Sequence, residues 1–357
     1  MSDSLLLTGA TGFLGMELIA RWLEDDDGPD LFVAVRARDE AGAHERVDQL
    51  LSCLYEKPPA GAGRLRPVRG DLTAPGLGLS ARDRAAITRS VERVVHCAAS
   101  VSFGLPVEDA RAINVGGTAE VLSLARGIAG LERLVHVSTA YVAGRSLGVF
   151  REGDLQHDAS FRNTYEQTKH EAEQLVAAST DLPVVTVRPS IVVGESDSGW
   201  TSAFNVIYQP LRAFVRGHLR ELPADPFGLV DIVPVDHVAD VLHAATFTPA
   251  IGGTFCAAAG ARAMTLGELV ELISALLHRA PPRLSPKGDL PQRAAIFAPY
   301  FDVACCFDDQ RAVDLLGHRA PPTDDYLAAL LRYGRIADWG RRPLTRQAAR
   351  ARIPVAA

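Results

Sequence analysis

"LLLTGATGFLG", residues 5–15, is the stretch that decides the fold. An apolar run ends in three spaced glycines, Gly9, Gly12 and Gly15, and an amphipathic run follows. Glycine lets the backbone turn tightly and approach a pyrophosphate, which then lies at the N-terminus of the next helix, where free N–H groups point outwards. A tight strand-to-helix turn without any ligand would use the same pattern. Because the glycines follow the first strand of a predicted α/β sheet, they predict a dinucleotide site that includes the neighbouring residues Thr11, Phe13 and Leu14.

The first half of the chain alternates short apolar runs with helical patterns. We expect strands at 4–9, 31–37, 64–72, 91–99, 133–142 and 183–192, and helices at 13–25, 110–127 and 165–178. Strands that are nearly all apolar and are separated by helices indicate a parallel sheet covered on both faces. The expected fold class is therefore α/β, a doubly wound parallel sheet of the Rossmann type.

The rhythm changes after Pro189, where residues 196–228 become rich in glycine, proline and aromatic side chains. A chain of 357 residues is also long enough for a second lobe. We expect a dinucleotide-binding domain over 1–190 with a returning segment at about 229–259. A smaller, mostly helical substrate-binding lobe would consist of 191–228 and 260–357.

Composition excludes several classes of protein. The net charge of −6 and the pI of about 5.9 provide no positive field for nucleic acid. No apolar run approaches the roughly 18 residues of a membrane helix, and the N-terminus lacks a signal-peptide pattern. The five cysteines form no C-x-x-C, which favours a reducing compartment, and no histidine spacing is typical of a metal site. We expect a cytoplasmic protein with no metal, no membrane span and no nucleic-acid partner.

The end of the second expected strand indicates which dinucleotide binds. An NAD site usually places an acidic residue there to hold the ribose 2′-hydroxyl. This chain has Arg36 at that position and Arg38 nearby. A guanidinium matches a 2′-phosphate, although a strand-end arginine can also be simply solvated. The pattern favours NADPH.

A third pattern supplies acid–base chemistry. The chain has only three lysines, and one of them, Lys169, follows Tyr165 by four residues in "NTYEQTKHEA". On a helix these two side chains share a face, and an ammonium is expected to lower the pKa of a nearby tyrosine. An exposed Tyr–Lys helix pair is the alternative interpretation. Thr139, at the end of the expected strand before this helix, would bring its hydroxyl to the same edge of the sheet.

With these three residues and "TGATGFLG", the chain resembles the extended short-chain dehydrogenases/reductases. Within them it is most similar to the acyl-thioester reductases, which include the terminal reductase domains of peptide synthetases and the fatty acyl-CoA (male-sterility) reductases. The stretches "GDLTAPGLGLS" at 70–80 and "HCAASVSF" at 96–103 are the most specific part of the resemblance, which runs from residue 5 to about 245. It implies further cofactor contacts, at Asp71 and Leu72 for the adenine, Ala98, Ala99 and Ser100 for the pyrophosphate and ribose, Asn114 behind the site, and Pro189 and Ile191 at the nicotinamide.

The resemblance implies an NADPH-dependent oxidoreductase that reduces an acyl thioester to the aldehyde, or onward to the alcohol. Thr139 and Tyr165 would stabilise the developing oxyanion, and Lys169 would hold the ribose. The thioester would be carried by CoA or by an acyl or peptidyl carrier protein. A ketone or hydroxyl dehydrogenase, a sugar-nucleotide epimerase with the same triad, and a non-catalytic NADP-binding regulator remain alternatives.

Two further patterns have open interpretations. Phe204, Ile207, Tyr208 and Leu211 form one helical stripe, which either packs on the core or walls a channel for an acyl chain. The arginines of "RRPLTRQAARAR" at 341–352 either form a solvated helix face or contact an acidic carrier protein or a CoA phosphate.

Overall fold

The computed structural model describes residues 4–156, 159–204, 207–285, 300 and 303–352. Its centre is one seven-stranded sheet in the order β12-β7-β5-β4-β1-β2-β3, and all neighbouring strands are parallel. This confirms the expected fold class. The strands are β1 (Ser4–Thr8), β2 (Asp30–Val35), β3 (Leu65–Arg69), β4 (Arg93–His96), β5 (Arg133–Val137), β7 (Val184–Pro189) and β12 (Gly253–Ala257).

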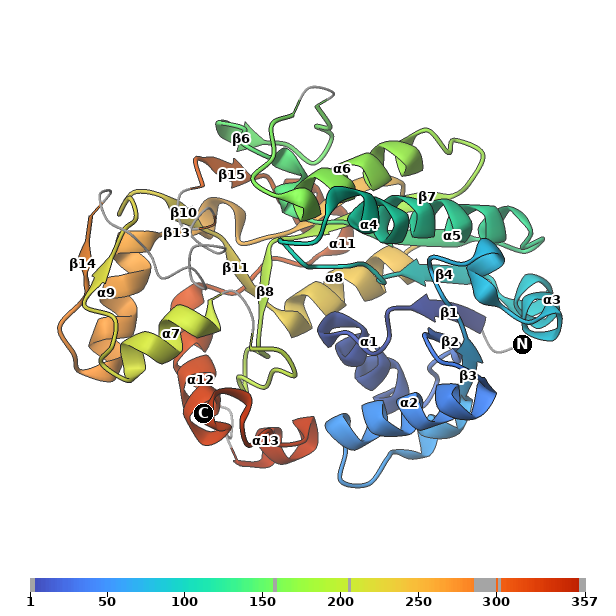
Figure 1. The fold of residues 1–357 in the computed structure, drawn as a ribbon, viewed down its shortest axis with the longest axis horizontal. Coiled ribbons are helices and arrows are strands. Elements are labelled where there is room, and N and C mark those ends of the chain that lie inside the picture. Colours follow the sequence, from blue (N-terminus) through green and yellow to red (C-terminus); the bar gives the residue numbers. More distant parts are fainter. Residues whose placement is uncertain (1–3, 157–158, 205–206, 286–299, 301–302, 353–357) are drawn as a thin grey trace.

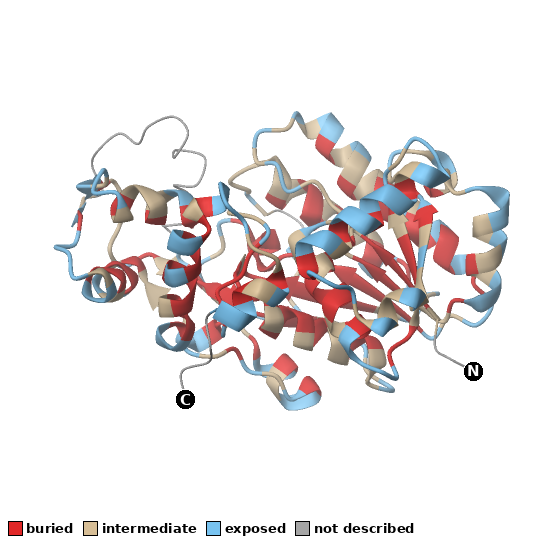
Figure 2. Ribbon diagram, turned by 90° about the horizontal axis from the view of Figure 1, so that it is seen from below, coloured by how far each residue is buried: buried red, intermediate tan, exposed pale blue. Residues whose placement is uncertain are grey.

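Helices cover both faces of this sheet, as Figure 1 shows. One face carries α1 (Phe13–Glu24), α2 (Glu40–Leu54) and α8 (Val235–Phe247), and the other carries α3 (Ala81–Ser90), α5 (Gly117–Arg126) and α6 (Thr164–Ala177). Each strand is buried on both sides, which explains its nearly continuous apolar sequence. Figure 2 shows the buried residues concentrated in the sheet and on the helix faces turned towards it.

A smaller lobe lies at the end of the molecule opposite α3 (Figure 1). Its own apolar core is built around α7 (Tyr208–Val215), α9 (Leu266–Leu277) and α12 (Thr323–Ile336). Four two-stranded sheets accompany it, namely β6 (Gly148–Phe150) with β15 (Cys305–Phe307), β8 (Ile191–Val193) with β11 (Ile232–Pro234), β9 (Glu221–Leu222) with β14 (Arg283–Leu284), and β10 (Leu229–Val230) with β13 (Met264–Thr265).

Short elements complete the described chain. They are α4 (Val107–Arg111), α11 (Gln310–Leu316), α13 (Arg346–Arg352) and 3₁₀ turns at Ala60–Arg64, Pro75–Gly78, Ala140–Ala143, Gly260–Arg262 and Asp338–Gly340. None of the described helices is both long and apolar enough to cross a lipid bilayer.

Three elements differ from the sequence expectation. The expected strand at 133–142 ends at Val137, and Ala140–Ala143 form a 3₁₀ turn. The expected strand at 183–192 divides at Ser190, so that β7 belongs to the main sheet and β8 pairs with β11 in the lobe. The expected helix at 110–127 is α4 and α5 joined by a π turn at Ala112–Gly116. Such turns reshape a helix locally and are common at functional sites.

Candidate active site

The residues expected to bind cofactor or to catalyse lie at one edge of the sheet. They follow the carboxyl ends of β1 to β5 and β7, or stand on α6 and the π turn beside these ends. In an open parallel sheet, ligands bind at this edge. The fold therefore brings together groups that are up to about 180 residues apart in the sequence.

The glycine turn between β1 and α1 is built for a close approach. Gly9 has a positive φ of 80°, and a Cβ on it would lie 2.5 Å from the backbone nitrogen of Ala98. A Cβ on Gly15 would lie 2.2 Å from the carbonyl oxygen of Gly9. Both positions thus require glycine for the fold itself. Gly12 is exposed, and a Cβ there would meet only the Gly9 carbonyl, at 3.2 Å.

The N-terminus of α1 is suited to an anion. Gly12 is its N-cap, and no side chain caps the helix, so its first N–H groups are available to a phosphate. The pyrophosphate of a dinucleotide fits this open turn. Of the other residues expected here, Thr11 is half-buried in the turn, whereas Phe13 and Leu14 pack partly on the core. The ring of Phe13 lies 6.0 Å from that of Trp200.

The arginines after β2 are exposed. Neither Arg36 nor Arg38 forms a hydrogen bond to another residue in the described ranges. The pKa of Asp71 is lowered, first by hydrogen bonds from Thr73 and further by the positive charges of Arg36 and Arg69. The positive charge of Arg36 therefore acts on Asp71, the residue expected at the adenine. Leu72 packs beside Gly117, where a Cβ would lie only 2.8 Å from the Cβ of Leu72.

Asn114 explains the π turn. Its Oδ1 accepts a hydrogen bond from the Ser100 backbone at 2.7 Å, and its Nδ2 donates to the Ser100 carbonyl at 3.1 Å and to the Thr168 hydroxyl at 2.9 Å. It thereby connects the Ala98–Ser100 segment after β4 to the middle of α6. A regular helix would direct this side chain differently, so the π turn positions a residue between two walls of the site.

Thr139 lies between β5 and β7. Its buried hydroxyl lies 3.4 Å from the carbonyl oxygen of Pro189 and accepts a hydrogen bond from the backbone N–H of Tyr141 at 3.3 Å. Pro189 and Ile191, the residues expected at the nicotinamide, are both buried here. Tyr141 is a buried core tyrosine.

Tyr165 and Lys169 occupy the same face of α6 but point to different depths. Tyr165 is half-buried, and its hydroxyl interacts with that of Thr139. Lys169 is buried, and its Nζ donates to the carbonyl oxygen of Val137 at 2.8 Å. Tyrosine and threonine hydroxyls therefore meet at the site, while the ammonium lies behind them at the end of β5.

The pKa shifts differ from the sequence expectation. Burial raises the pKa of Tyr165 to about 12, and the interaction with Thr139 only partly opposes this. Burial lowers the pKa of Lys169 to about 8, against the opposing charge of Glu173. The expected lowering of the tyrosine pKa is thus not found, because the loss of solvent outweighs the neighbouring groups. Tyr165 is consequently a hydrogen-bond donor at neutral pH.

A buried ion pair that the sequence analysis missed supports these residues. Glu173, one further turn along α6, pairs with Arg188 of β7 and accepts a hydrogen bond from Ser138 at 2.5 Å. Ser138 and Arg188 directly precede Thr139 and Pro189 in the sequence. The four-residue spacing from Tyr165 to Lys169 continues to Glu173, and this could have placed Glu173 on the same helix face. No local pattern in the sequence pointed to Arg188 as its partner.

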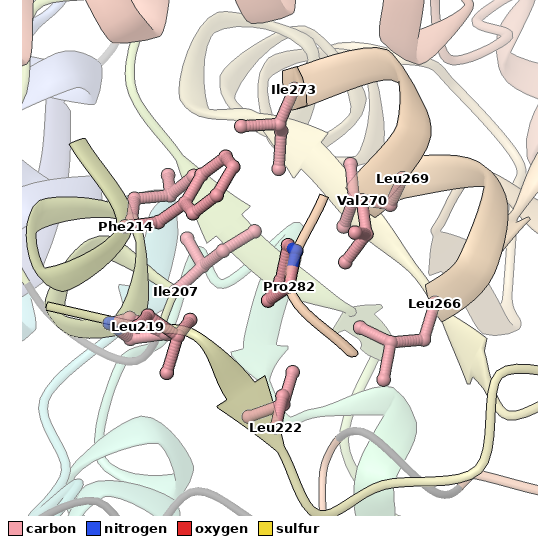
Figure 3. Close-up of a pocket in the computed structure, with 11 residues that line it drawn as sticks. Ile207, Phe214, Leu219, Leu222, Leu266, Leu269, Val270, Ile273 and Pro282 are labelled. Atoms are coloured by element: carbon pink, nitrogen blue, oxygen red, sulfur yellow. The ribbon is translucent and has the colours of Figure 1, made fainter. Parts of the chain in front are cut away.

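The expected stripe is only partly helical, because α7 begins at Tyr208 and both Phe204 and Ile207 precede it. Phe204 packs against Tyr208, and the Tyr208 hydroxyl accepts a hydrogen bond from the Gly194 backbone at 2.8 Å, so these two belong to the core. Ile207 and Leu211 belong to the same core and also line a pocket between α7 and α9 (Figure 3). All eleven lining residues are apolar: Ile207, Pro210, Leu211, Phe214, Leu219, Leu222, Leu266, Leu269, Val270, Ile273 and Pro282.

The pocket is narrow. Its free volume is about 40 Å³, well below the roughly 150 Å³ of an apolar cavity that admits benzene. An acyl chain would enter only if α7 and α9 moved apart.

Both interpretations of the C-terminal arginines are wrong for Arg346. This side chain is buried and makes two hydrogen bonds to Glu17 of α1, at 2.6 and 2.9 Å. It also contacts Glu195 at 2.5 Å and Glu24 at 2.7 Å. Arg350, which is exposed, pairs with Glu195 as well. The helix α13 therefore joins the C-terminal segment to the helix that begins at the glycine turn.

The chain is similar to several known proteins. The NAD-binding family model described as male sterility protein matches residues 7–242. The fatty acyl-CoA reductase wat of Drosophila melanogaster is 30% identical over 277 residues, which are 68% of this chain and 54% of that protein. Human fatty acyl-CoA reductase 1 is 32% identical over 279 residues, with the same coverage. This chain spans about half the length of these curated relatives.

Among solved structures, the terminal R domain from the myxalamid PKS-NRPS biosynthetic pathway superposes with a TM-score of 0.81. It is 26% identical, and the match covers 96% of this chain and 93% of that one. The enzyme WbmG of Bordetella bronchiseptica, solved with NAD, shares the fold at a TM-score of 0.68 and 20% identity, over 94% and 95% of the two chains.

The fold and these similarities define a dinucleotide-binding protein of the extended short-chain dehydrogenase/reductase type. Within this class, the chain belongs to the male sterility protein family.

Proposed function

We propose that this chain is an NADPH-dependent reductase of acyl thioesters that forms the aldehyde, with Thr139, Tyr165 and Lys169 as its catalytic residues. The observation that carries the proposal is the meeting of two hydroxyls, Thr139 and Tyr165, beside the buried Lys169 at the sheet edge that bears the open glycine turn. The family membership and the similarity to the myxalamid R domain over nearly the whole chain support a thioester as the substrate.

The cofactor would be held along this edge. The glycine turn and the N-terminus of α1 bind the pyrophosphate, Arg36 and Arg38 bind the 2′-phosphate, and Pro189 and Ile191 bound the nicotinamide end. When bound, NADPH supplies the hydride that reduces the acyl carbon. Lys169 provides a buried positive charge that can reorient from the Val137 carbonyl to a ribose hydroxyl.

The residues of the site act on the acyl oxygen. Tyr165, which its raised pKa keeps protonated, donates a hydrogen bond to that oxygen, and Thr139 donates a second one. The overall reaction converts the thioester, NADPH and one proton into aldehyde, free thiol and NADP⁺. The acyl chain is directed towards the lobe that holds the apolar pocket, where each buried methylene contributes about 0.8 kcal/mol.

The test supplies the purified protein with NADPH and either acyl-CoA, carrier-bound acyl, ketone or sugar-nucleotide substrates. A thiol-reactive dye and the absorbance of the reduced nicotinamide report the two products together. Equal amounts of thiol and oxidised NADPH indicate an aldehyde product, and a twofold excess of NADPH oxidation indicates the alcohol. Turnover of ketones without thiol release from any thioester would refute the thioester assignment.

A pocket variant tests the direction of the acyl chain. Val270→Phe fills the space between α7 and α9 and is expected to raise KM for long-chain thioesters while leaving short-chain ones unchanged. An equal effect on all chain lengths contradicts this part of the proposal.

A further inference from the structure

The N-terminus of α6, which carries the proposed acid Tyr165, is tied to a residue far away in the sequence. Asn163 caps this helix, since its Oδ1 accepts a hydrogen bond from the Glu166 backbone at 3.0 Å. Its Nδ2 donates to the hydroxyl of Tyr300 at 2.7 Å. Tyr300 belongs to the C-terminal part of the chain and is only 2% exposed. The side-chain amide of Asn163 therefore caps α6 and is itself held by Tyr300, from the C-terminal part of the chain.

The ring of Tyr300 supports the same turn from another direction. It stacks on Phe103 with a centroid distance of 5.0 Å, and Phe103 in turn lies 5.8 Å from the ring of Tyr165. Tyr141 closes the back of this group, with its ring edge-on to Tyr300 at 4.8 Å. These aromatic contacts leave the Tyr165 ring little freedom to tilt.

The first turn of α6 has a further anchor. The Thr164 hydroxyl donates to the carbonyl oxygen of Leu105 at 3.0 Å, which fixes the loop that carries Phe103. The Tyr300 hydroxyl accepts a hydrogen bond from Asn163, and its own O–H interacts as a donor with the buried carboxylate of Glu166. Because Tyr165 is the second residue of the helix, a small shift of the cap moves its hydroxyl relative to Thr139.

We propose that Tyr300 is a positioning residue for the reaction: through Asn163 and Phe103 it holds Tyr165 in the orientation in which its hydroxyl meets that of Thr139. This inference rests on the proposed function of Tyr165. It also assigns a role to the C-terminal part of the chain, which connects the lobe to the catalytic helix.

The experiment separates the hydroxyl from the ring. Tyr300→Phe keeps the aromatic stack and removes the acceptor of the Asn163 amide. Asn163→Ser keeps a good helix cap and removes the donor. Each variant is expected to lower kcat about tenfold and to leave the affinity for NADPH unchanged. The double variant should be no slower than Tyr300→Phe alone, because that change already removes the contact with Asn163.

A matched control excludes a general effect of losing a buried tyrosine hydroxyl. Tyr326 is 1% exposed and donates to the carbonyl oxygen of Ile232 at 2.9 Å, away from α6. Tyr326→Phe is expected to keep the wild-type kcat. Three results would overturn the proposal. They are additive losses of kcat in the double variant of Tyr300 and Asn163, an unchanged kcat in Tyr300→Phe, and an equal loss of kcat in Tyr326→Phe.

Amide hydrogen exchange provides a readout that needs no turnover. In Tyr300→Phe the amides of residues 164–168 should exchange faster than in the wild type and in Tyr326→Phe. If the wild type reduces no thioester, the proposed function fails, and this exchange comparison still decides whether Tyr300 holds the first turn of α6. Equal exchange in both variants overturns the inference whatever the substrate is.

Discussion

At the scale of single residues, burial sets the chemistry of the site more strongly than neighbouring charge does. Tyr165 and Lys169 are four residues apart, yet the pKa of the tyrosine moves up to about 12 and that of the lysine moves down to about 8. Both shifts disfavour the charged form, which is the effect of removing solvent. At neutral pH the site therefore combines a protonated tyrosine with a lysine that is close to its titration point.

The pKa of Lys169 predicts the pH profile. We expect kcat/KM for NADPH to fall as pH rises through about 8, because the ammonium that is proposed to hold the ribose is lost. The pKa of Lys169 is lower in the folded protein than its ordinary value of 10.5, so the neutral amine favours the folded state. The stability that this group contributes is present at high pH and is lost as pH falls through about 8. Deprotonation of Lys169 by itself therefore does not destabilise the fold, so the expected loss of activity is not due to unfolding caused by this group.

This pH dependence is checked by measuring steady-state rates and unfolding midpoints on the same samples across the pH range. A profile that stays flat between about pH 7 and about pH 10 would contradict the role of Lys169. Tyr165→Phe serves as the reference for the acid itself and should lose most turnover while keeping NADPH affinity.

Arg36 predicts the choice of cofactor. We expect NADPH to bind at least about tenfold more tightly than NADH, or about 1.4 kcal/mol, from a charge-assisted contact with the 2′-phosphate. Arg36→Asp should remove this preference, whereas Arg46→Ser, which alters an exposed arginine of α2, should not. Fluorescence titrations with both nucleotides measure the ratio, and equal affinities in the wild type would refute the assignment.

At the scale of elements, α6 is held against the ends of two strands. Glu173 and Arg188 are 3% and 1% exposed and link the helix to β7, while the Ser138 hydroxyl links it to β5. These contacts come together where Thr139 and Pro189 emerge. The buried pair thus orders the geometry of the site as well as the core.

Breaking this pair is predicted to be costly. Glu173→Gln leaves the guanidinium of Arg188 buried without its counter-charge and should lower the free energy of unfolding by about 3–5 kcal/mol. Chemical denaturation measures the loss. Asp181→Asn, which breaks the exposed pair between Arg126 and Asp181, is the matched control and should leave the midpoint unchanged. Similar losses in both variants would contradict the argument from burial.

At the scale of the whole molecule, the buried Arg346 closes the structure. It brings α13 against α1, although their contacting residues are 329 positions apart. Glu17, its principal partner, has a pKa raised to about 7, chiefly by burial. A carboxylate of this kind is tolerated because the guanidinium binds both of its oxygens.

Replacing Arg346 should destabilise the protein in a pH-dependent way. Arg346→Leu is expected to lower the free energy of unfolding by about 3–5 kcal/mol near neutral pH. Arg346 lowers the pKa of Glu17 against the effect of burial, so its removal raises this pKa above the wild-type value of about 7. A protonated Glu17 needs no counter-charge, so the defect should be smaller at acidic pH. Arg352→Leu, at an exposed site on the same helix, is the control. A defect that does not depend on pH would exclude Glu17 as the group left unpaired.

Local patterns in the sequence predicted much of this molecule. The glycine turn, the apolar strands and the Tyr165–Lys169 spacing depend on contacts within a few turns of the chain, so they specified the parallel sheet and the edge at which the expected residues meet. The division of the strand at Ser190 and the π turn at Asn114 were missed, because hydrogen bonds to distant segments decide both.

The sequence by itself therefore determined the fold class, the dinucleotide turn and the residues proposed for catalysis, since periodicity and short motifs carry them. Only the tertiary structure decided the depth of Lys169, the raised pKa of Tyr165, the burial of Arg346 and the contact between Tyr300 and Asn163. These properties depend on solvent exclusion and on partners from remote segments. No local pattern encodes them.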